Sequence, residues 1–266
     1  MRRNRQTHTS LPLFIPAAPC YYLDMRVLVI SDIHANLSAL EAVLDVAEAY
    51  KAVWCLGDLV GYGPDPNECV EIIRSLPNLL CLIGNHDQAA IGMIPLSRFN
   101  REAGAIAAWT RQKLSNESIK YLRSLPSKIT TLNYTLAHGS PNQPIWEYIL
   151  DQHTADRSFD ALKTDYSLVG HTHLPVIYHR PPGDTFSKTK RIQWEGEMAL
   201  LPKMILNPGS VGQPRDRDPR ASYAILDTEA ATWEMRRITY DIAQVQARIM
   251  EAGLPERQAQ RLNSGW

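Results

Sequence analysis

The sequence predicts an α/β protein in which helices cover two β-sheets. In the first half, short apolar runs alternate with segments of helical periodicity, which is the β-α-β-α-β order of a parallel sheet. The second half is rich in short strands. The 266-residue chain is 44% apolar and 21% charged, a composition typical of a globular protein. Two sheets packed face to face, with helices outside them, accommodate both halves.

The first half contains three expected strands and two expected helices. The strands are apolar and rich in β-branched residues, which favours buried parallel strands over Val27–Ser31, Ala52–Leu56 and Leu79–Ile83. A helix is expected over Leu37–Tyr50, after the N-cap residue Asn36. A second helix is expected over Pro66–Leu76, where the proline suits the first turn.

The middle of the chain is expected to be helical and the rest rich in strands. Arg98–Leu114 and Glu117–Ser124 have the pattern of helices. Short strands are expected over Ile129–Leu132, Tyr134–Ala137, Tyr166–Val169, Val176–Tyr178, Lys203–Leu206, Ala221–Asp227 and Thr232–Ile238. A helix over Asp241–Glu251 closes the fold, and Pro181–Lys190 forms a polar hairpin or loop.

No linker or repeat divides the chain, so residues 25–252 are expected to form one domain, followed by a polar C-terminal tail over 253–266. Residues 1–24 are expected to be a disordered extension, because prolines interrupt their apolar stretch and Met25 directly precedes a strand. A secretion signal is the alternative interpretation of this extension. No apolar run is long enough to cross a membrane, so no membrane association is expected.

Charge and cysteine content narrow the function classes. Lys plus Arg equals Asp plus Glu, 28 of each, so the net charge does not indicate a general nucleic-acid binder. The four cysteines form no C-x-x-C pair, and Cys55 and Cys81 lie in apolar runs. Buried free thiols, and hence a reducing, cytoplasmic location, are expected.

Polar motifs follow the expected strands at five places. They are Asp-Ile-His at 32–34, Gly-Asp at 57–58, Gly-Asn-His-Asp at 84–87, His-Gly at 138–139 and Gly-His-Thr-His at 170–173. Loops at the carboxyl ends of strands are where α/β proteins bind their ligands. We therefore expect the five motifs to converge on one edge of the sheets.

These motifs contain seven oxygen or imidazole donors and no thiolate. They are Asp32, His34, Asp58, Asn85, His138, His171 and His173. A single aspartate or histidine at the end of a strand is usually a cap or a turn residue, but five such motifs in sequence favour a metal site. Seven donors exceed the needs of one four-coordinate zinc and suit two divalent ions that share a carboxylate. Mixed oxygen and nitrogen ligands suit manganese, iron, zinc, cobalt or nickel, and manganese is our first choice.

The five motifs, in this order, resemble those of calcineurin-like metallophosphoesterases over about residues 25–227. The resemblance implies a four-layer α-β-β-α sandwich of two mixed sheets flanked by helices. It implies that one metal is held by Asp32, His34, Asp58 and His173. It also implies that Asp58 bridges to a second metal, which Asn85, His138 and His171 complete.

The resemblance further implies hydrolysis of a phosphodiester or phosphomonoester by in-line attack of a hydroxide between the two metals. It places His86 facing the substrate and Asp87 orienting it. His86 then either donates a proton to the leaving group or stabilises charge on the phosphoryl group. The expected substrate is a small phosphate ester, and the sequence leaves the oligomeric state open.

Other branches of the family remain as alternatives. Serine/threonine protein phosphatases carry an arginine where this chain has Tyr62, so the motifs resemble more closely those of small bacterial and archaeal phosphoesterases. A protein phosphatase-like enzyme, a nucleotide or nucleic-acid hydrolase, and a scaffold that lacks activity are the other interpretations. Intact ligand motifs disfavour the scaffold, and the neutral charge disfavours a nucleic-acid substrate.

Substrate contacts are less clearly marked than metal ligands. The weaker candidates are Tyr62, Asn207, Ser210 and Arg215. The loop at Asn207–Gly212 either supports the site structurally or contacts the substrate. The arginines that follow it, Arg215, Arg217 and Arg220, lie in a solvated loop or recognise phosphate. Three aromatic residues, Trp109, Trp146 and Tyr148, belong to the core or line a pocket.

Overall fold

The structure is a computed structural model that describes residues 25–47 and 50–266. It has two mixed six-stranded sheets flanked by helices, so the predicted four-layer sandwich is confirmed. The extension expected over residues 1–24 lies outside the described residues. Among the helices of the described chain, none is long and apolar enough to cross a membrane.

The first sheet contains the three strands of the predicted β-α-β-α-β segment. Its order is β3, β2, β1, β11, β12 and β9. In that order the strands span Leu79–Cys81, Ala52–Cys55, Arg26–Ile30, Ala221–Asp227, Thr232–Ile238 and Glu197–Ala199. Strands β1, β2 and β3 are parallel, so their carboxyl ends lie at the same edge of the sheet.

The second sheet contains most of the strands predicted in the second half. Its order is β4, β5, β6, β10, β7 and β8. In that order the strands span Lys128–Thr131, Tyr134–Ala137, Tyr166–Leu168, Met204–Asn207, Val176–His179 and Lys188–Lys190. Strands β5, β6 and β10 are parallel neighbours. The polar segment expected to form a hairpin or loop joins β7 to β8, which pair antiparallel.

One hydrophobic core lies between the two sheets, and another lies between the first sheet and the helices that cover it. Along β1, Val27 and Val29 face the second sheet, whereas Leu28 and Ile30 face the helices on the other side. Both faces of this strand are therefore covered, which explains its unbroken apolar sequence. Trp54 of β2 is fully buried in the same central core.

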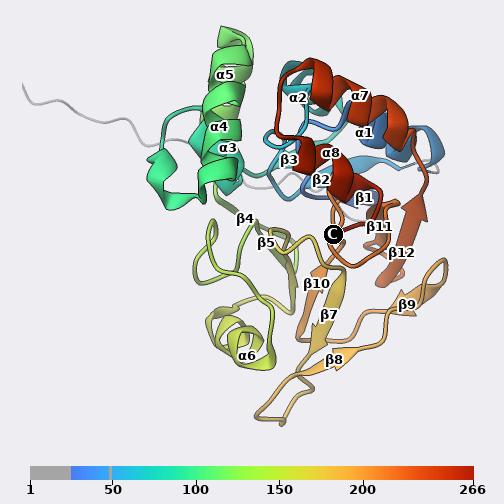
Figure 1. The fold of residues 1–266 in the computed structure, drawn as a ribbon. Coiled ribbons are helices and arrows are strands. Elements are labelled where there is room, and N and C mark those ends of the chain that lie inside the picture. The colour runs from blue at the N-terminus through green and yellow to red at the C-terminus, as the bar shows by residue number, and fades with distance from the viewer. Residues whose placement is uncertain (1–24, 48–49) are drawn as a thin grey trace, which may run out of the picture.

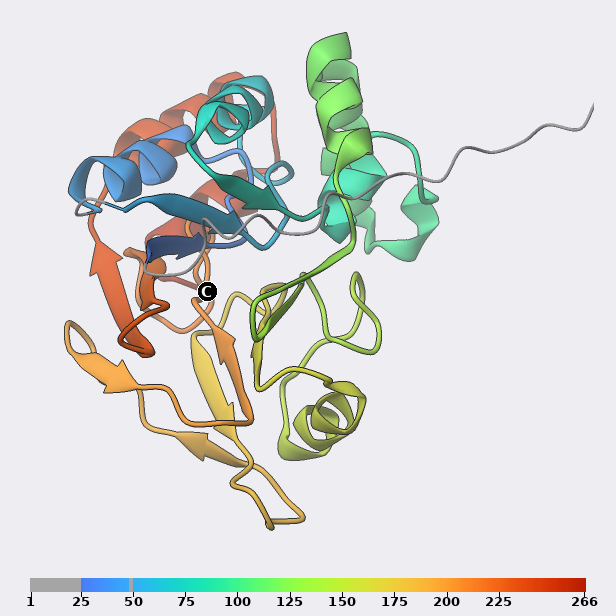
Figure 2. The ribbon, with the colours of Figure 1, turned by 180° about the vertical axis from the view of Figure 1, so that it is seen from behind.

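Helices form the two outer layers, as Figures 1 and 2 show. Helices α1 (Leu37–Val46) and α2 (Pro66–Ser75) cover the first sheet, and α7 (Ile242–Glu251) lies beside α1. Helix α6 (Gln152–Ala161), which the sequence did not predict, covers the second sheet. Asn36 caps α1 as predicted, because its side-chain oxygen accepts a hydrogen bond from the Ala39 amide.

A helical segment stands beside the sandwich. It contains α3 (Asn85–Ala90), α4 (Arg101–Lys113) and α5 (Asn116–Ser124), of which the last two were predicted. Helix α3 begins inside the Gly-Asn-His-Asp motif, so this motif is a turn from strand into helix.

The structure differs from the expected polar tail over residues 253–266. This segment contains helix α8 (Glu256–Leu262), whose Ala259 and Leu262 are buried against Ile249 of α7 and Ile106 of α4. A helix of seven residues presents very few apolar positions, so the sequence pattern is too short to reveal it. The segment is part of the domain, and it closes one side of the candidate site.

Candidate metal centre

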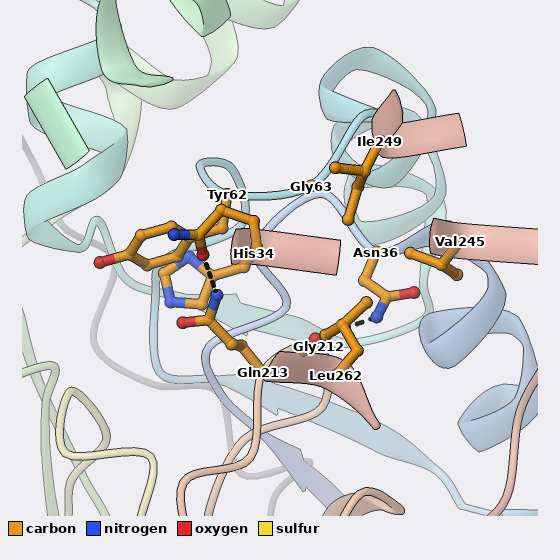
Figure 3. Close-up of a pocket in the computed structure, with 10 residues that line it drawn as sticks. His34, Asn36, Tyr62, Gly63, Gly212, Gln213, Val245, Ile249 and Leu262 are labelled. Atoms are coloured by element: carbon orange, nitrogen blue, oxygen red, sulfur yellow. Dashed lines mark hydrogen bonds between the residues drawn. The ribbon is translucent and has the colours of Figure 1, made fainter. Parts of the chain in front are cut away.

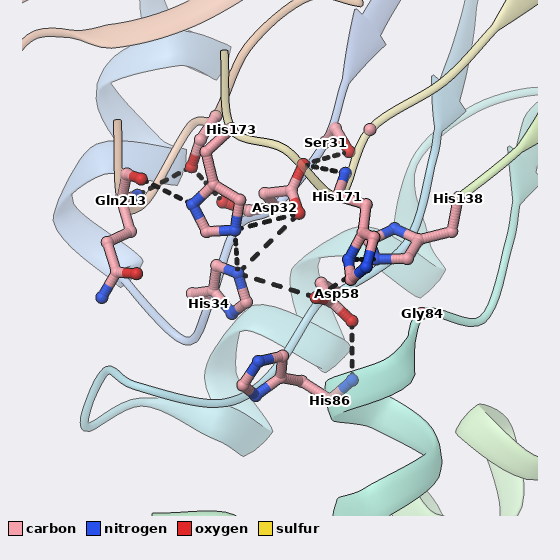
Figure 4. Close-up of polar contacts among 12 residues, drawn as sticks. Ser31, Asp32, His34, Asp58, Gly84, His86, His138, His171, His173 and Gln213 are labelled. Carbon is pink, nitrogen blue, oxygen red and sulfur yellow. Dashed lines mark hydrogen bonds and ion pairs between the residues drawn. The ribbon is translucent and has the colours of Figure 1, made fainter. Parts of the chain in front are cut away.

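The five polar motifs lie at the carboxyl ends of strands that are parallel neighbours. Asp32 and Asp58 follow β1 and β2 of the first sheet. His138 follows β5 of the second sheet, and His171 and His173 follow β6. Because the sheets pack face to face, the two sets of loops meet at one edge, as Figure 4 shows.

One group of candidate metal ligands contains Asp32, His34 and His173. The two histidine Nε2 atoms lie 3.0 Å apart. Oδ1 of Asp32 lies 3.8 Å from Nε2 of His34 and 3.3 Å from Nε2 of His173. All three side chains are buried, and their facing atoms are close enough to hold one ion.

The second group contains Asp58, His138 and His171. Nε2 of His138 lies 3.3 Å from Oδ2 of Asp58 and 3.2 Å from Nδ1 of His171. Oδ1 of Asn85 lies 3.1 Å from the same His138 nitrogen, so Asn85 extends this group. The structure thus brings together all seven donors that the sequence singled out.

Asp58 lies between the two groups. Its Oδ2 is 3.7 Å from Nε2 of His34 in the first group and 3.3 Å from Nε2 of His138 in the second. Its Oδ1 accepts a hydrogen bond of 2.9 Å from the backbone amide of His86, which fixes the orientation of the carboxylate. This is the place that a carboxylate shared by two ions would occupy.

Backbone carbonyls orient three of the histidines. Nδ1 of His34, His138 and His173 lies 3.1, 2.9 and 2.6 Å from the carbonyl oxygens of Val60, Leu56 and Gln213, respectively. Since a carbonyl only accepts, each Nδ1 donates the proton and each Nε2 offers its lone pair to the site. Such contacts fix the tautomer and ring orientation of metal-ligating histidines.

Two buried carboxylate oxygens of the site have no hydrogen-bond partner among the described residues and could bind cations. Within the described chain, Oδ1 of Asp32 and Oδ2 of Asp58 are buried and accept no hydrogen bond. A buried polar atom without a partner is costly, and a buried charge without compensation is more so. Both oxygens face imidazole Nε2 atoms, which can offer lone pairs to a cation once the rings are neutral. The donor set therefore fits two divalent ions, one in each group.

The pKa values of the ligands show that the site favours positive charge. Burial raises the pKa of Asp32 to about 6. Burial by itself would lower the pKa of His138, but the Asp58 and Asp32 carboxylates raise it to about 9. The two carboxylates thus attract a positive charge into the space between the sheets.

The backbone at the ligands is held in an uncommon conformation. Five ligands have positive φ angles between 50° and 65°, namely Asp32, His34, Asp58, His171 and His173. Non-glycine residues rarely adopt this region, and when they do they cluster at functional sites. Gly84 is required for a different reason, because a Cβ there would lie 2.0 Å from Oδ1 of Asp58.

His86 faces the site from the start of α3. Its ring centroid lies 4.9 Å from that of His34 and 4.5 Å from that of Tyr62, and Phe99 packs edge-on at 4.9 Å. Burial lowers the pKa of His86 to about 4, so the imidazole is neutral near pH 7. It lies beside both ligand groups without being part of either group.

The structure corrects the role expected for Asp87. Instead of contacting the His86 imidazole, its carboxylate accepts three backbone hydrogen bonds of 2.9–3.0 Å, from Gly84, Asp58 and Val60. Both oxygens are thereby used. Asp87 positions the loop that carries Asp58 against the loop that carries Asn85.

Two of the weaker substrate candidates are also corrected. The Asn207 amide donates to the Gly170 carbonyl and the Thr172 hydroxyl, and its oxygen accepts from the Gly209 amide. The Ser210 hydroxyl donates to the Asp32 carbonyl and accepts from the Gln213 amide. Both side chains are buried and fully used in holding the ligand loops, which is the structural role left open for this segment.

Tyr62 and Arg215 lie at the edge of the site. The Tyr62 ring lies against His34 (Figure 3), and the distance between the two ring centroids is 4.7 Å. The guanidinium carbon of Arg215 lies 5.8 Å from the Tyr62 ring. Arg215 donates to Oε1 of Gln213 at 3.0 Å, whereas its Nε is buried without an acceptor in the described chain.

One aromatic residue that the sequence left open between the core and a pocket lies at the site. Tyr148 stacks on the ligand His171 with a centroid distance of 3.7 Å, and 43% of it is exposed. Trp146 packs on Phe99, and Trp109 packs on the cluster formed by α4, α7 and α8. In the sequence, the only signal for this stacking on His171 is that Tyr148 lies two residues after Trp146 in an aromatic segment.

Comparison with known proteins agrees with this geometry. The profile of the calcineurin-like phosphoesterase superfamily domain matches residues 25–231. The Methanocaldococcus jannaschii protein MJ0912 is 39% identical over 89% of this chain and 97% of its own length. The crystal structure of a metallophosphoesterase from Sphaerobacter thermophilus is 43% identical, with a TM-score of 0.84 over 91% of this chain and all of that one.

More distant similarities are partial or concern the fold alone. The structure of PH1004 from Pyrococcus horikoshii has a TM-score of 0.76 at 24% identity, over 91% of this chain and 98% of that one, which supports the fold. A symmetrical bis(5'-nucleosyl)-tetraphosphatase from Psychromonas ingrahamii is 26% identical over 46% of each chain. The chain belongs to the calcineurin-like phosphoesterase superfamily.

Proposed function

We propose that the protein is a metal-dependent hydrolase of phosphoric esters. The observation that carries the proposal is the position of Asp58, whose Oδ2 faces Nε2 of His34 at 3.7 Å and Nε2 of His138 at 3.3 Å. A carboxylate placed between two ligand groups is typical of a two-metal centre. Membership of the phosphoesterase superfamily supports the same chemistry.

The residues divide between the two metals as the groups indicate. Asp32, His34 and His173 would hold one ion, His138, His171 and Asn85 the other, and Asp58 both. Two divalent ions, manganese being the first choice, would supply a hydroxide nucleophile at neutral pH and a charge clamp on the phosphoryl oxygens.

Residues around the two groups complete the proposed mechanism. His86 contributes a neutral imidazole that hydrogen-bonds the phosphoryl group or the leaving oxygen. Tyr62 packs against both His86 and His34, so it keeps these rings in place and limits the access of water. Arg215 brings a positive charge to the same edge, where it offsets negative charge on the substrate.

We propose a small phosphate ester as the substrate, in the diester or monoester form. The partial similarity to a bis(5'-nucleosyl)-tetraphosphatase supports a nucleotide. A protein phosphatase is less well supported, because Tyr62 occupies the place of the arginine of that branch. The expectations that the substrate is not a nucleic acid and that the location is cytoplasmic stay predictions from the sequence, which leaves the oligomeric state open.

The proposal is tested on protein that a chelator has stripped of metal. Hydrolysis of bis-p-nitrophenyl phosphate and p-nitrophenyl phosphate is measured before and after adding manganese, iron, zinc, cobalt or nickel. We expect no turnover without metal and recovery with at least one of these ions. Full activity of the stripped protein, or no activity with any ion, would contradict the proposal.

A further inference from the structure

A cationic pocket adjoins the candidate metal centre on the side of α8. It has a volume of about 90 Å³ and is lined in part by Tyr62, Arg257 and Arg261. The Tyr62 ring forms its wall toward His34 and His86, so one aromatic ring separates the pocket from the metal ligands.

Three arginines gather at this place. Arg257 and Arg261 come from α8, and Arg215 lies on the same tyrosine ring from the loop after β10. Burial lowers the pKa of Arg261, the charges of Arg215 and Arg257 lower it further, and Tyr62 and Glu102 oppose this shift. We call these three residues the arginine pocket.

The positive charge of the arginine pocket is only partly offset by the described residues around it. In the part of the chain that the structure describes, no side-chain carboxylate forms an ion pair with any of the three arginines. Glu102 also lines the cavity, and its carboxylate, which accepts a hydrogen bond from the Gln258 amide at 2.5 Å, offsets one of the three positive charges. Nε of Arg261 donates to the main-chain oxygen of Trp266, which leaves its terminal nitrogens unused.

Hydrogen bonds connect the arginine pocket to the metal ligands. Gln213 accepts from Arg215 with its side chain and from Nδ1 of His173 with its backbone carbonyl. The side-chain nitrogen of Gln213 donates to the side-chain oxygen of Gln258 on α8 at 2.9 Å. The pocket is therefore held in a fixed position relative to the metal centre, which a subsite for one substrate requires.

We propose that the arginine pocket binds a second phosphate group of the substrate, next to the one that is hydrolysed. The proposal rests on the proposed function and narrows its substrate class to esters that carry two or more linked phosphates, such as nucleoside polyphosphates. Guanidinium groups suit this task, because they stay charged and bind phosphate oxygens through paired donors.

Arg257→Gln is the most direct test, because Arg257 is exposed and forms no hydrogen bond or ion pair within the described residues. With manganese-loaded protein, we expect KM for diadenosine tetraphosphate to rise about tenfold more than KM for bis-p-nitrophenyl phosphate. Arg257→Lys retains the charge but lacks the paired donors, so it should recover only part of the affinity. Arg217→Gln is the matched control, since Arg217 lies two residues after Arg215 but packs over Trp266.

A binding measurement that does not depend on a nucleotide complements the kinetics. Inorganic tripolyphosphate should inhibit the hydrolysis of bis-p-nitrophenyl phosphate more strongly than orthophosphate, and Arg257→Gln should remove that difference. Equal inhibition by both anions in the wild type, or equal KM changes for both substrates in Arg257→Gln, would overturn the second subsite. If the metal-loaded wild type hydrolyses neither substrate, the proposed function itself would instead be overturned.

Discussion

At the scale of single residues, Asp58 is the candidate ligand that faces both groups. It contacts members of both ligand groups through one oxygen, while the other is fixed by a backbone amide. The other candidate ligands each belong to one group. Replacing Asp58 should therefore affect both ions, whereas replacing another ligand affects mainly one.

Asp58→Asn should reduce the content of bound metal and lower kcat at least about 100-fold, since loss of contacts around a bound metal costs ~10–100-fold even when the ligands remain. Metal analysis and hydrolysis of bis-p-nitrophenyl phosphate measure both effects. Asp45→Asn, which changes an exposed aspartate on α1, is the control and should change neither. Asp58→Asn protein that keeps two bound ions would exclude a shared carboxylate.

His86→Gln should lower kcat by roughly 10–100-fold and leave the metal content near that of the wild type, because His86 lies outside both ligand groups. No carboxylate contacts its imidazole in the described structure, and burial lowers its pKa to about 4. We therefore expect it to act as a neutral hydrogen-bond donor, with similar losses for good and poor leaving groups. A much larger loss for alkyl than for p-nitrophenyl esters would show that His86 protonates the leaving oxygen.

Asp87→Asn should mainly destabilise the fold. An amide would place its own N–H groups against backbone amides that now donate to the carboxylate, which leaves buried donors unpaired. We expect a loss of about 1–3 kcal/mol in the free energy of unfolding, measured by urea titration. A loss of kcat at unchanged stability would instead favour the role first expected for Asp87, the orientation of His86.

At the scale of elements, the segment expected to be a tail contains helix α8, which lines the cavity beside the candidate metal centre. Its apolar face packs on α4 and α7, and its Gln258 is hydrogen-bonded to Gln213, the residue whose carbonyl orients His173. The helix therefore connects the end of the chain to a candidate metal ligand. Its contribution can be tested separately from the arginine pocket, through its buried face.

Leu262→Ala should lower the free energy of unfolding by about 2–3 kcal/mol, because it removes a side chain that is only 5% exposed. Gln260→Ala on the exposed side of the same helix is the matched control and should cost about 0.5 kcal/mol or less. Thermal unfolding of both variants decides the matter. Equal melting temperatures would mean that residues 253–266 are indeed a tail outside the cooperative fold.

At the scale of the whole molecule, the candidate metals would join the two sheets. Asp32, His34 and Asp58 follow strands of the first sheet, whereas His138 and His171 follow strands of the second. Each group contains residues from both sheets. Metal binding is therefore expected to stabilise the packing of one sheet on the other.

Manganese added to chelator-stripped protein should raise the melting temperature. A ligand at 100 times its dissociation constant stabilises the native state by about 2.7 kcal/mol per site. Differential scanning calorimetry should show this shift in the wild type and a much smaller one in Asp58→Asn. An unchanged melting temperature in the wild type would argue against ion binding between the sheets.

Local sequence patterns predicted most strands and the donors at their ends. Buried parallel strands require unbroken apolar runs, and each run here stops at a polar motif, so Asp32 or His171 could be assigned to a strand end without knowledge of the fold. Helix α6 and strand β9 escaped prediction, and β8 was expected only as part of a hairpin or loop, because these elements are short or largely polar.

The sequence by itself determined the layer order, the position of the polar motifs along the chain and the chemical type of the ligands, because these depend on neighbouring residues. The tertiary structure alone decided what each polar side chain contacts. Asp87 binds amides 27 and 29 residues away, and Gln213 binds a glutamine 45 residues away. The sequence suggested His86 as the partner of Asp87 and made no assignment for Gln213, whereas contacts between distant loops assign both residues to the support of the ligands. Such contacts arise only when the two sheets pack, so no local periodicity encodes them.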